Sequence, residues 1–368
     1  MESPARRDMY FPGTEDLGAD EMRVTSCGTG MPASRRSQAA TCWLVELGNG
    51  DKFIFDIGSG SAANLASLAI PYDFLDRLFL THLHQDHIGD LVALWAGGWT
   101  GGRHGALRVW GPSGPEAELG TQHAVDTMKS MFRWDYLSRL DLIPNRGGDV
   151  EVQEFDYRQV NEVVYEENGV TIRSWPAIHI MDGPVSYSLE WNGLKFVFGG
   201  DTIPNEWYVE HAKGADLAIH ECFMGPPLMM EKYGFGPAVA LRVSTDAHTV
   251  PAAFGAVMDE VKPRMAVAYH FFNDFDTRYP IEEGIRQSYD GPLTLATDLL
   301  VWNITKDDIR VREAIVDEAA WPTPSPTPPD DGPFEPVSMS EFIDGGRFDV
   351  SETLDPLIDQ FKQEHGLD

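Results

Sequence analysis

The residues with the clearest chemical potential form the motif HxHxDH at positions 82–87, directly after a short apolar run. In an extended segment alternate side chains point to the same side, so we expect His82 and His84 to project together. Asp86 and His87 are expected at the turn into the following helix. Imidazole nitrogens and carboxylate oxygens are common ligands of zinc and other first-row metal ions. The motif therefore predicts one loop that serves two neighbouring metal positions, with a surface histidine-rich turn as the alternative.

Three isolated polar residues supply the remaining ligands that two metal ions would need. His179 follows the segment TIRSWPAI, Asp201 ends KFVFGGD and His270 ends RMAVAYH, so each closes an apolar stretch that we predict as a strand. A lone histidine at a strand end is more often a capping or surface residue. Together with the first motif, these residues bring the set to five histidines and two aspartates. That set suffices for two metal ions that share one carboxylate.

Composition and charge narrow the classes of function. The chain has 368 residues, of which 42% are hydrophobic, so it can bury a large core. Its 58 acidic residues stand against 28 lysines and arginines, and the formal charge of -30 opposes binding to nucleic acids and anionic membranes. The three cysteines, Cys27, Cys42 and Cys222, form no CxxC pair and indicate neither a disulfide framework nor a thiolate zinc site.

The sequence contains no recognisable segment for membrane insertion or export. No apolar run approaches the roughly 18 residues needed to cross a bilayer. The first residues also lack the apolar core of a signal peptide. We therefore expect a cytoplasmic protein without a membrane partner. Removal of a leader from a longer precursor would leave the same pattern and is the alternative.

Proline content predicts three parts along the chain. Residues 321–336 hold seven prolines, which disfavour helix and sheet and indicate an extended linker. This linker would divide a body of residues 1–320 from an acidic tail of residues 337–368. An amphipathic pattern at residues 350–365 predicts a helix in the tail. The tail is either a disordered acidic segment or an arm that docks on its own body or on a partner subunit.

The body alternates short strands with helices in two similar halves, which predicts two sheets packed face to face with helices outside. Asn49-Gly50 and Asn192-Gly193 indicate hairpin turns. The predicted helices cover residues 90–95, 122–132, 207–213 and 251–261. The predicted strands cover residues 22–26, 42–47, 52–56, 77–80, 107–110, 163–165, 170–175, 185–191, 195–198, 217–220 and 265–269.

The order of the HxHxDH motif and the later His, Asp and His resembles the metallo-β-lactamase superfamily, over about residues 22–305. The resemblance implies an αββα sandwich of two mixed β-sheets flanked by helices. Asp56 matches the aspartate that braces the metal loop in this superfamily. The resemblance also implies that one metal ion is held by His82, His84 and His179, that a second is held by Asp86, His87 and His270, and that Asp201 bridges them.

Four shorter motifs resemble the tRNase Z-like branch of the superfamily. They are GTGMP at residues 28–32, WGPSG at 110–114, HE at 220–221 and HT at 248–249. In that branch the glutamate of the HE motif orients the histidine of the HT motif, which assists proton transfer. This likeness implies a catalytic set of His248, Glu221 and Asp86. A purely structural His248 at the start of a helix is the alternative.

Other features favour a small substrate over a tRNA. No lysine-rich insertion corresponds to the basic arm of tRNase Z, and the acidic charge opposes a polyanion. Residues 21–25, 49–61, 79–84 and 109–114 resemble arylsulfatases of this fold and hydrolases associated with guanitoxin biosynthesis. We therefore expect a homodimeric hydrolase with two Zn²⁺ ions per chain, for which Mn²⁺ or Fe are alternatives. It would cleave a small organic ester, namely a sulfate ester, phosphodiester, lactone or carboxylic ester, with a metal-bridging hydroxide.

Three other functions stay open at this point. A tRNase Z-like nuclease is supported by the four short motifs, while a mononuclear-iron oxygenase of the same fold would need a single iron ion. A non-catalytic binding protein would be expected to have lost ligands, and the motif positions retain all of them. Three aromatic segments, residues 95–103, 223–233 and 271–279, are candidate walls of a substrate pocket, with ordinary packing as the alternative.

Overall fold

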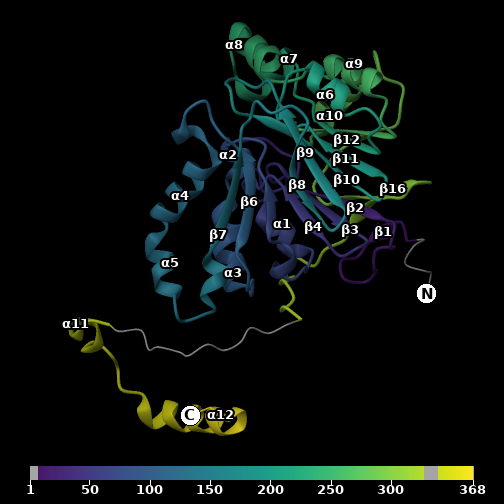
Figure 1. The fold of residues 1–368 in the computed structure, drawn as a ribbon. Helices are drawn as coiled ribbons and strands as arrows, with labels where there is room; N and C mark the ends of the chain where they lie inside the picture. Colours follow the sequence, from purple (N-terminus) through teal and green to yellow (C-terminus); the bar gives the residue numbers. More distant parts are fainter. Residues whose placement is uncertain (1–6, 327–338, 368) are drawn as a thin grey trace. The chain divides into compact units, whose positions relative to one another are not determined.

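The computed structural model describes residues 7–326 and 339–367. The chain forms two units, a large one that ends at residue 330 and a small one that begins at residue 331. The large unit contains two mixed β-sheets with helices on their outer faces (Figure 1). This arrangement confirms the predicted αββα fold class.

The first sheet has nine strands in the order β1-β16-β15-β2-β3-β4-β5-β6-β7. Its middle strands β2, β3 and β4 pair antiparallel, whereas β4 through β7 run parallel. The strands are β1 Met9–Tyr10, β2 Met22–Gly28, β3 Cys42–Leu47, β4 Lys52–Phe55, β5 Arg77–Phe79, β6 Leu107–Pro112, β7 Val150–Phe155, β15 Leu300–Ile304 and β16 Ile309–Ala314.

The second sheet has seven strands in the order β14-β13-β12-β11-β10-β9-β8. Strands β8 to β11 pair antiparallel and β11 to β14 run parallel. The strands are β8 Glu162–Glu167, β9 Val170–Pro176, β10 Val185–Trp191, β11 Leu194–Phe198, β12 Leu217–Glu221, β13 Met265–Tyr269 and β14 Leu293–Leu295.

Aromatic side chains fill the space between the two sheets. Phe55 of the first sheet lies 5.0 Å from Phe196 of the second, measured between ring centroids. Trp43 meets the edge of Tyr269 at 5.6 Å. These rings belong to one buried cluster to which both sheets contribute. Each large ring removes much apolar area from water, so this layer fixes the spacing of the sheets and of the loops at their ends.

Helices cover the outer face of each sheet, which explains why central strands such as β3 are buried along their whole length. Over the first sheet lie α1 Ser61–Ser67, α2 Gln85–Ile88, α3 Gly98–Thr100, α4 Thr121–Met131 and α5 Arg133–Arg139. Over the second lie α6 Glu206–His211, α7 Pro226–Tyr233, α8 Pro237–Arg242, α9 Pro251–Val261 and α10 Phe275–Ile285.

The predicted helix at residues 90–95 falls within a helical stretch at residues 91–100, whose middle part is not regular α-helix. A separate short helix, which was not predicted, begins earlier, at Gln85, because the carbonyl of the extended His84 accepts hydrogen bonds from the backbone N–H groups of His87 and Ile88. Residues Ala93–Gly97 form a π-helical turn instead of regular α-helix. The consequence is that half of the HxHxDH motif lies on a helix and half on the loop before it.

The start of the predicted linker contacts the large unit. The Thr323 hydroxyl donates a hydrogen bond to the carbonyl of Ala69 at 3.1 Å, and Pro322 is buried. The rest of the predicted linker, from residue 327, lies outside the described residues. The small unit contains α11 Glu341–Asp344 and α12 Ser351–His365, which agrees with the predicted helix at 350–365. Along α12, one face carries Leu354, Leu357, Ile358 and Phe361, all exposed.

In the described parts of the chain, no helix combines the length and the apolar character that a membrane crossing requires.

Candidate metal centre

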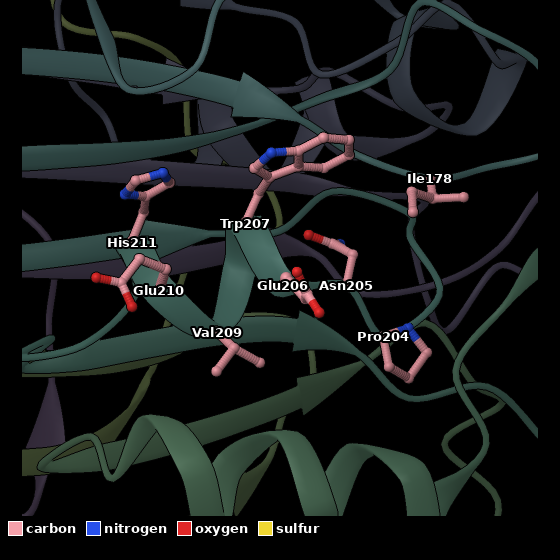
Figure 2. Close-up of a pocket in the computed structure, with 8 residues that line it drawn as sticks. All are labelled: Ile178, Pro204, Asn205, Glu206, Trp207, Val209, Glu210 and His211. Atoms are coloured by element: carbon pink, nitrogen blue, oxygen red, sulfur yellow. The ribbon is translucent and has the colours of Figure 1, made fainter.

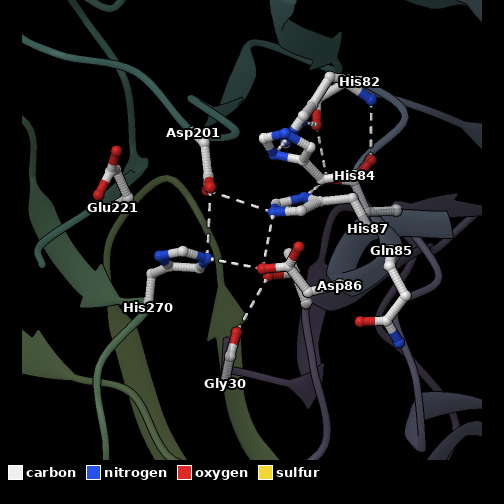
Figure 3. A network of polar contacts seen from close by, with 12 residues as sticks. Gly30, His82, His84, Gln85, Asp86, His87, Asp201, Glu221 and His270 are labelled. Atoms are coloured by element: carbon white, nitrogen blue, oxygen red, sulfur yellow. Dashed lines mark hydrogen bonds and ion pairs between the residues drawn. The ribbon is translucent and has the colours of Figure 1, made fainter. Parts of the chain in front are cut away.

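The seven predicted ligands converge because they follow strands whose carboxyl ends lie at the same edge of the sandwich. His82 and His84 come after β5, and Asp86 and His87 lie on α2 directly behind them. In the second sheet, His179 follows β9, Asp201 follows β11 and His270 follows β13. These strand ends face one another across the sandwich, so ligands distant in sequence meet at one edge (Figure 3).

One set of ligand atoms comes from three histidines and one aspartate. Nδ1 of His84 lies 3.1 Å from Nε2 of His82 and 3.2 Å from Nε2 of His179. Asp201 completes the set, and all four ligand atoms lie within 4.8 Å of one another. Three imidazole nitrogens that approach a common point have the donor arrangement of a metal site.

A second set shares Asp201 with the first. Nε2 of His270 lies 3.1 Å from Oδ2 of Asp86 and 3.3 Å from Oδ2 of Asp201. Nε2 of His87 lies 3.3 Å from the other Asp201 oxygen, Oδ1. Asp201 therefore lies between the two sets, with its oxygens directed to different histidines (Figure 3). This is the place that the sequence resemblance implies for a bridging carboxylate.

Several buried polar atoms of these residues have no hydrogen-bond partner, and this shows whether the residues suit metal ions. Both Asp201 oxygens, Oδ1 of Asp86 and Nε2 of His87 are buried without a hydrogen-bond partner. Buried polar atoms are rarely left in this state, because each loses its interaction with water. A cation held by these atoms would compensate them, and imidazole and carboxylate are suitable ligands for a first-row ion. The residues of both sets thus fit metal ions.

Burial keeps two histidines of the first set in the neutral form, which is the form that binds metal. Burial lowers the pKa of His82 well below its ordinary value and lowers that of His179 to about 4. Both imidazoles are consequently neutral near neutral pH, with a lone pair available. Burial alone would raise the pKa of Asp201, but the imidazoles of His270 and His87 outweigh it and hold that pKa well below its usual range.

His87 differs from the histidines of the first set. Burial acts to lower its pKa, but Asp201, Asp56 and Asp86 together raise it well above the ordinary value. A proton and a metal ion would therefore compete for this imidazole. Asp56, which is fully buried, accepts a hydrogen bond on Oδ2 from Nδ1 of His87 at 2.6 Å. It also accepts hydrogen bonds from the hydroxyl and the backbone N–H of Thr81, so Nε2 of His87 is directed toward Asp201.

His248 and Glu221 form a pair beside the ligands. Nδ1 of His248 lies 2.9 Å from Oε1 of Glu221, which also accepts the backbone N–H of Thr202. Phe223 stacks on the His248 ring, with centroids 4.0 Å apart and 10° between planes. Burial raises the pKa of Glu221 well above its ordinary value and lowers the pKa of His248. Both shifts favour the uncharged forms of the two groups, a protonated carboxyl group and a neutral imidazole. The proton then lies between Oε1 of Glu221 and Nδ1 of His248.

The structure also places His248 and Glu221 in a third set of candidate ligands, with His179. The backbone carbonyl of Ala247 engages Nδ1 of His179 at 2.7 Å, which leaves Nε2 for the first set. Nδ1 of His248 is likewise engaged by Glu221. The pair therefore matches the predicted proton-transfer role, and that role stays a prediction.

Three residues at this edge have an unfavourable backbone conformation. Asp56, Ile180 and His270 adopt left-handed backbone conformations, with φ of 57°, 48° and 73°. Such values are unfavourable for residues other than glycine, and most of all for a β-branched residue such as Ile180. Gly58 is required nearby, because a Cβ there would lie 2.0 Å from the Asp86 carbonyl oxygen. Strain of this kind is typical of functional sites.

Asp298 was not predicted from the sequence. It lies just before β15 and holds the loops beside the site through hydrogen bonds. Its carboxylate accepts hydrogen bonds from the backbone and hydroxyl of Thr29, the backbone of Ala39 and the side chain of Asn64. The Thr29 carbonyl in turn accepts the backbone N–H of His270. Burial raises the pKa of Asp298 to about 6 despite these donors. An aspartate after a short strand carries no sequence signal for this role.

The proposed pocket wall at residues 95–103 is wrong. Trp95, Trp99 and Arg103 are buried, and the Arg103 guanidinium donates to the carbonyls of Leu94, Trp95 and Gly147. These side chains hold the π-helical turn against the loop before β7. In the segment 223–233, Phe223 reaches the site through its contact with His248. In the segment 271–279, Phe271 is buried, whereas Phe275 and Tyr279 are exposed.

Comparisons with known proteins agree with the fold. Residues 37–220 match the family described as the metallo-beta-lactamase superfamily. The chain is 31% identical over 207 residues to ribonuclease Z of Mycobacterium marinum, which covers 54% of this chain and 70% of that protein. It is 32% identical over 203 residues to ribonuclease Z of Mycobacterium sp. (strain KMS), with 54% and 68% covered.

Two solved structures have the same fold. The metallo-beta-lactamase fold protein YhfI from Bacillus subtilis superposes with a TM-score of 0.57 at 19% identity, covering 77% of this chain and 100% of that one. The short form of human tRNase Z gives a TM-score of 0.53 at 18% identity, covering 76% and 98%.

Proposed function

The chain belongs to the metallo-beta-lactamase superfamily and is a metal-dependent hydrolase of ester or phosphodiester bonds, and we propose that its substrate is a small organic phosphodiester. The similarity to ribonucleases Z favours phosphodiester chemistry. The observation that carries the proposal is the pair of His248 and Glu221 beside the shared ligand Asp201. A proton donor at this point suits a bond whose leaving group is a poor one, such as an alkoxide.

The two ligand sets are proposed to hold one ion each, with Asp201 common to both. When bound, such ions would lower the pKa of a water molecule and neutralise negative charge on the phosphate oxygens. We propose zinc, with manganese or iron as alternatives, because histidine-rich sets with few carboxylates suit zinc.

The chain's own residues then have distinct parts. His248 donates a proton to the leaving oxygen, and Glu221 positions the imidazole through the 2.9 Å contact with Nδ1. Asp56 keeps His87 in one tautomer, and the stacked Phe223 limits rotation of His248. Because Glu221 and Asp56 are both fully buried, water does not compete for these contacts.

A ribonuclease is the second candidate function, favoured by the similarity to ribonucleases Z. The net charge of -30 argues against it, since each phosphate contact needs a cation. Arylsulfatase-like activity, a homodimer and a cytoplasmic location remain predictions that belong to this proposal. Size-exclusion chromatography with light scattering and cell fractionation test the last two.

The decisive experiment combines metal analysis with a substrate screen. The purified protein should contain about two zinc, manganese or iron ions per chain. It should hydrolyse small phosphodiesters faster than sulfate esters, carboxylic esters, lactones and a precursor tRNA. Faster cleavage of the tRNA would favour the ribonuclease, and preference for another small ester would replace the phosphodiester. One iron per chain together with oxygen consumption would indicate an oxygenase and overturn the proposal.

A further inference from the structure

A pocket opens beside the first ligand set. It has a volume of about 250 Å³, and His82, His84 and His179 form part of its wall. The volume lies just below the range of about 300 to 1,000 Å³ that is common for small-molecule sites. A substituent of the reacting ester that enters this pocket is thus limited to about one aromatic ring.

The other walls of the pocket are apolar or acidic. Leu83, Leu119, Ile180 and Met181 supply apolar surface, of which Ile180 is 68% exposed and Met181 55% exposed. Among the described residues that line the pocket, none is a lysine or an arginine, and Glu118 and Asp182 carry the formal charges. A negatively charged substituent would meet two carboxylates and neither lysine nor arginine on these walls.

Asp182 is held in place by its neighbours. The Tyr157 hydroxyl donates a hydrogen bond to Oδ2 of Asp182 at 3.0 Å. Arg158 lines a second hollow that shares residues 179–183 with the pocket, but its guanidinium is paired with Asp156 at 3.0 Å. Arg158 is therefore engaged mainly by Asp156, and it lines the second hollow and not the pocket.

The turn that forms the rim is strained. The N–H of Met181 donates to the His179 carbonyl at 2.5 Å, which closes a three-residue turn around the left-handed Ile180. The left-handed conformation is sterically unfavourable for a β-branched residue. Because the Ile180 side chain is mostly exposed, its packing offsets little of this cost. The turn directs Ile180 and Met181 to the opening beside the ligand His179.

A larger hollow nearby is less suited to the reacting ester. Its volume is about 960 Å³, and Trp207 and Ile178 lie on its walls with the acidic residues Glu206 and Glu210 (Figure 2). None of the candidate metal ligands belongs to its lining. The bond to be cleaved would therefore lie outside it.

We propose that the 250 Å³ pocket receives the non-reacting substituent of the ester, that it takes a compact apolar group, and that Glu118 and Asp182 exclude a negatively charged one. This inference rests on the proposed function and narrows its substrate class to esters whose only negative charge lies at the reacting centre. A polynucleotide carries a phosphate next to each scissile bond, so the same two carboxylates select against it.

The test compares two diesters that differ by one carboxylate, 4-nitrophenyl phenyl phosphate and 4-nitrophenyl 4-carboxyphenyl phosphate. The leaving group is the same in both. For the metal-loaded full chain, kcat/KM should be at least about tenfold higher for the phenyl diester. In the double variant Glu118→Lys, Asp182→Lys the ratio should fall below about threefold, because the repulsion becomes attraction.

A matched control changes the net charge equally at the larger hollow. The double variant Glu206→Lys, Glu210→Lys should keep the wild-type ratio. A wild-type enzyme that hydrolyses both diesters equally would overturn the inference, as would a ratio that both double variants change alike. Leu119→Asp provides a second readout and should lower kcat/KM for the phenyl diester by about tenfold; an unchanged value would remove the apolar wall from the proposal.

Failure of the phosphodiesterase proposal gives a different result. If neither diester is hydrolysed but 4-nitrophenyl benzoate is, the reaction class is wrong and the pocket can still be tested. A preference for 4-nitrophenyl benzoate over its 4-carboxy derivative, lost in Glu118→Lys, Asp182→Lys, would support the pocket. Equal rates on these two esters would overturn it.

Discussion

The inner and outer sides of the candidate metal centre are built differently. On the inner side, Asp86, His87, Asp201 and His270 are at most 1% exposed, and Asp56 braces His87 from a fully buried position. On the outer side, His84 is exposed, and the strained rim around Ile180 is open to solvent. The inner side is fixed by polar contacts that tolerate little change. The rim residues Ile180 and Met181 are not among the candidate metal ligands, so we expect reaction and specificity to have separate structural bases.

The largest effect is expected on the inner side, from Asp201→Ala. This change removes the carboxylate common to both ligand sets. Activity should fall by about 10³-fold or more, and metal content should drop below that of the wild type, as measured by steady-state kinetics and elemental analysis. Asp259→Ala, on the outer helix α9, is the matched control and should change neither. Full metal content with unchanged activity in Asp201→Ala would remove Asp201 from the bridging position.

His248→Ala should have the next largest effect. It tests whether His248, which lies between the inner and outer sides, transfers a proton. Metal content should stay nearly intact, while turnover falls about 10²- to 10⁴-fold on substrates with poor leaving groups. On a nitrophenyl ester the loss should be much smaller, because that leaving group departs without a proton. Glu221→Gln should show the same pattern more weakly. Equal losses on both kinds of substrate, or loss of metal, would make His248 a structural residue or a ligand.

Asp298, on the inner side, is expected to make the stability of the protein depend on pH. Its pKa is about 6 in the folded protein against an ordinary value of 3.8, so the folded state binds more protons than the unfolded state between these values. Stability contributed by this group is thus present at low pH and is lost as pH rises from about 4 to 6. Relative to Asp298→Asn, the wild-type free energy of unfolding should fall by up to about 3 kcal/mol between pH 4 and pH 7. Urea unfolding at several pH values measures this difference, and a flat difference would show that the four donors offset burial.

The smallest effect is expected on the outer side, from Ile180→Gly. Glycine adopts a left-handed backbone at no steric cost, so the free energy of unfolding should rise or stay within about 1 kcal/mol. The apolar rim would be lost, so kcat/KM for the phenyl diester should fall severalfold. Thermal denaturation and kinetics on the same preparation separate the two effects. Marked destabilisation would mean that the Ile180 side chain packs and is not strained.

Local spacing explains what could be predicted from sequence. The HxHxDH motif sits within six residues, and the remaining ligands close apolar strands, so their meeting at one edge followed from strand polarity. The bounds of β3, β13 and α9 also agree with the prediction, since a continuous apolar run or a proline at the first helical turn marks them. The ligand roles themselves stay predictions.

Tertiary contacts explain what could not be predicted. Asp298 and Thr81 act through hydrogen bonds to residues distant in the sequence, and no periodicity marks them. Helix α10 contains Pro280 in its interior, a residue that normally argues against a helix. The glycines and tryptophans at residues 95–103 resemble a mobile loop in composition, but Arg103 binds three backbone carbonyls and fixes them.

The strand order of the first sheet has a consequence for how this protein is made. Strand β2 lies between β3 and β15, and its partner Ile304 for Met22 is among the last residues of the sheet to leave the ribosome. Until β15 emerges, β2 presents an unpaired edge of buried apolar residues, which is open to association with other chains. When His270 has been synthesised, all seven candidate ligands are present in the nascent chain. The first sheet is still incomplete at that stage, because β15 follows His270 in the sequence. We therefore expect the nascent chain to be prone to association until β15 has been synthesised.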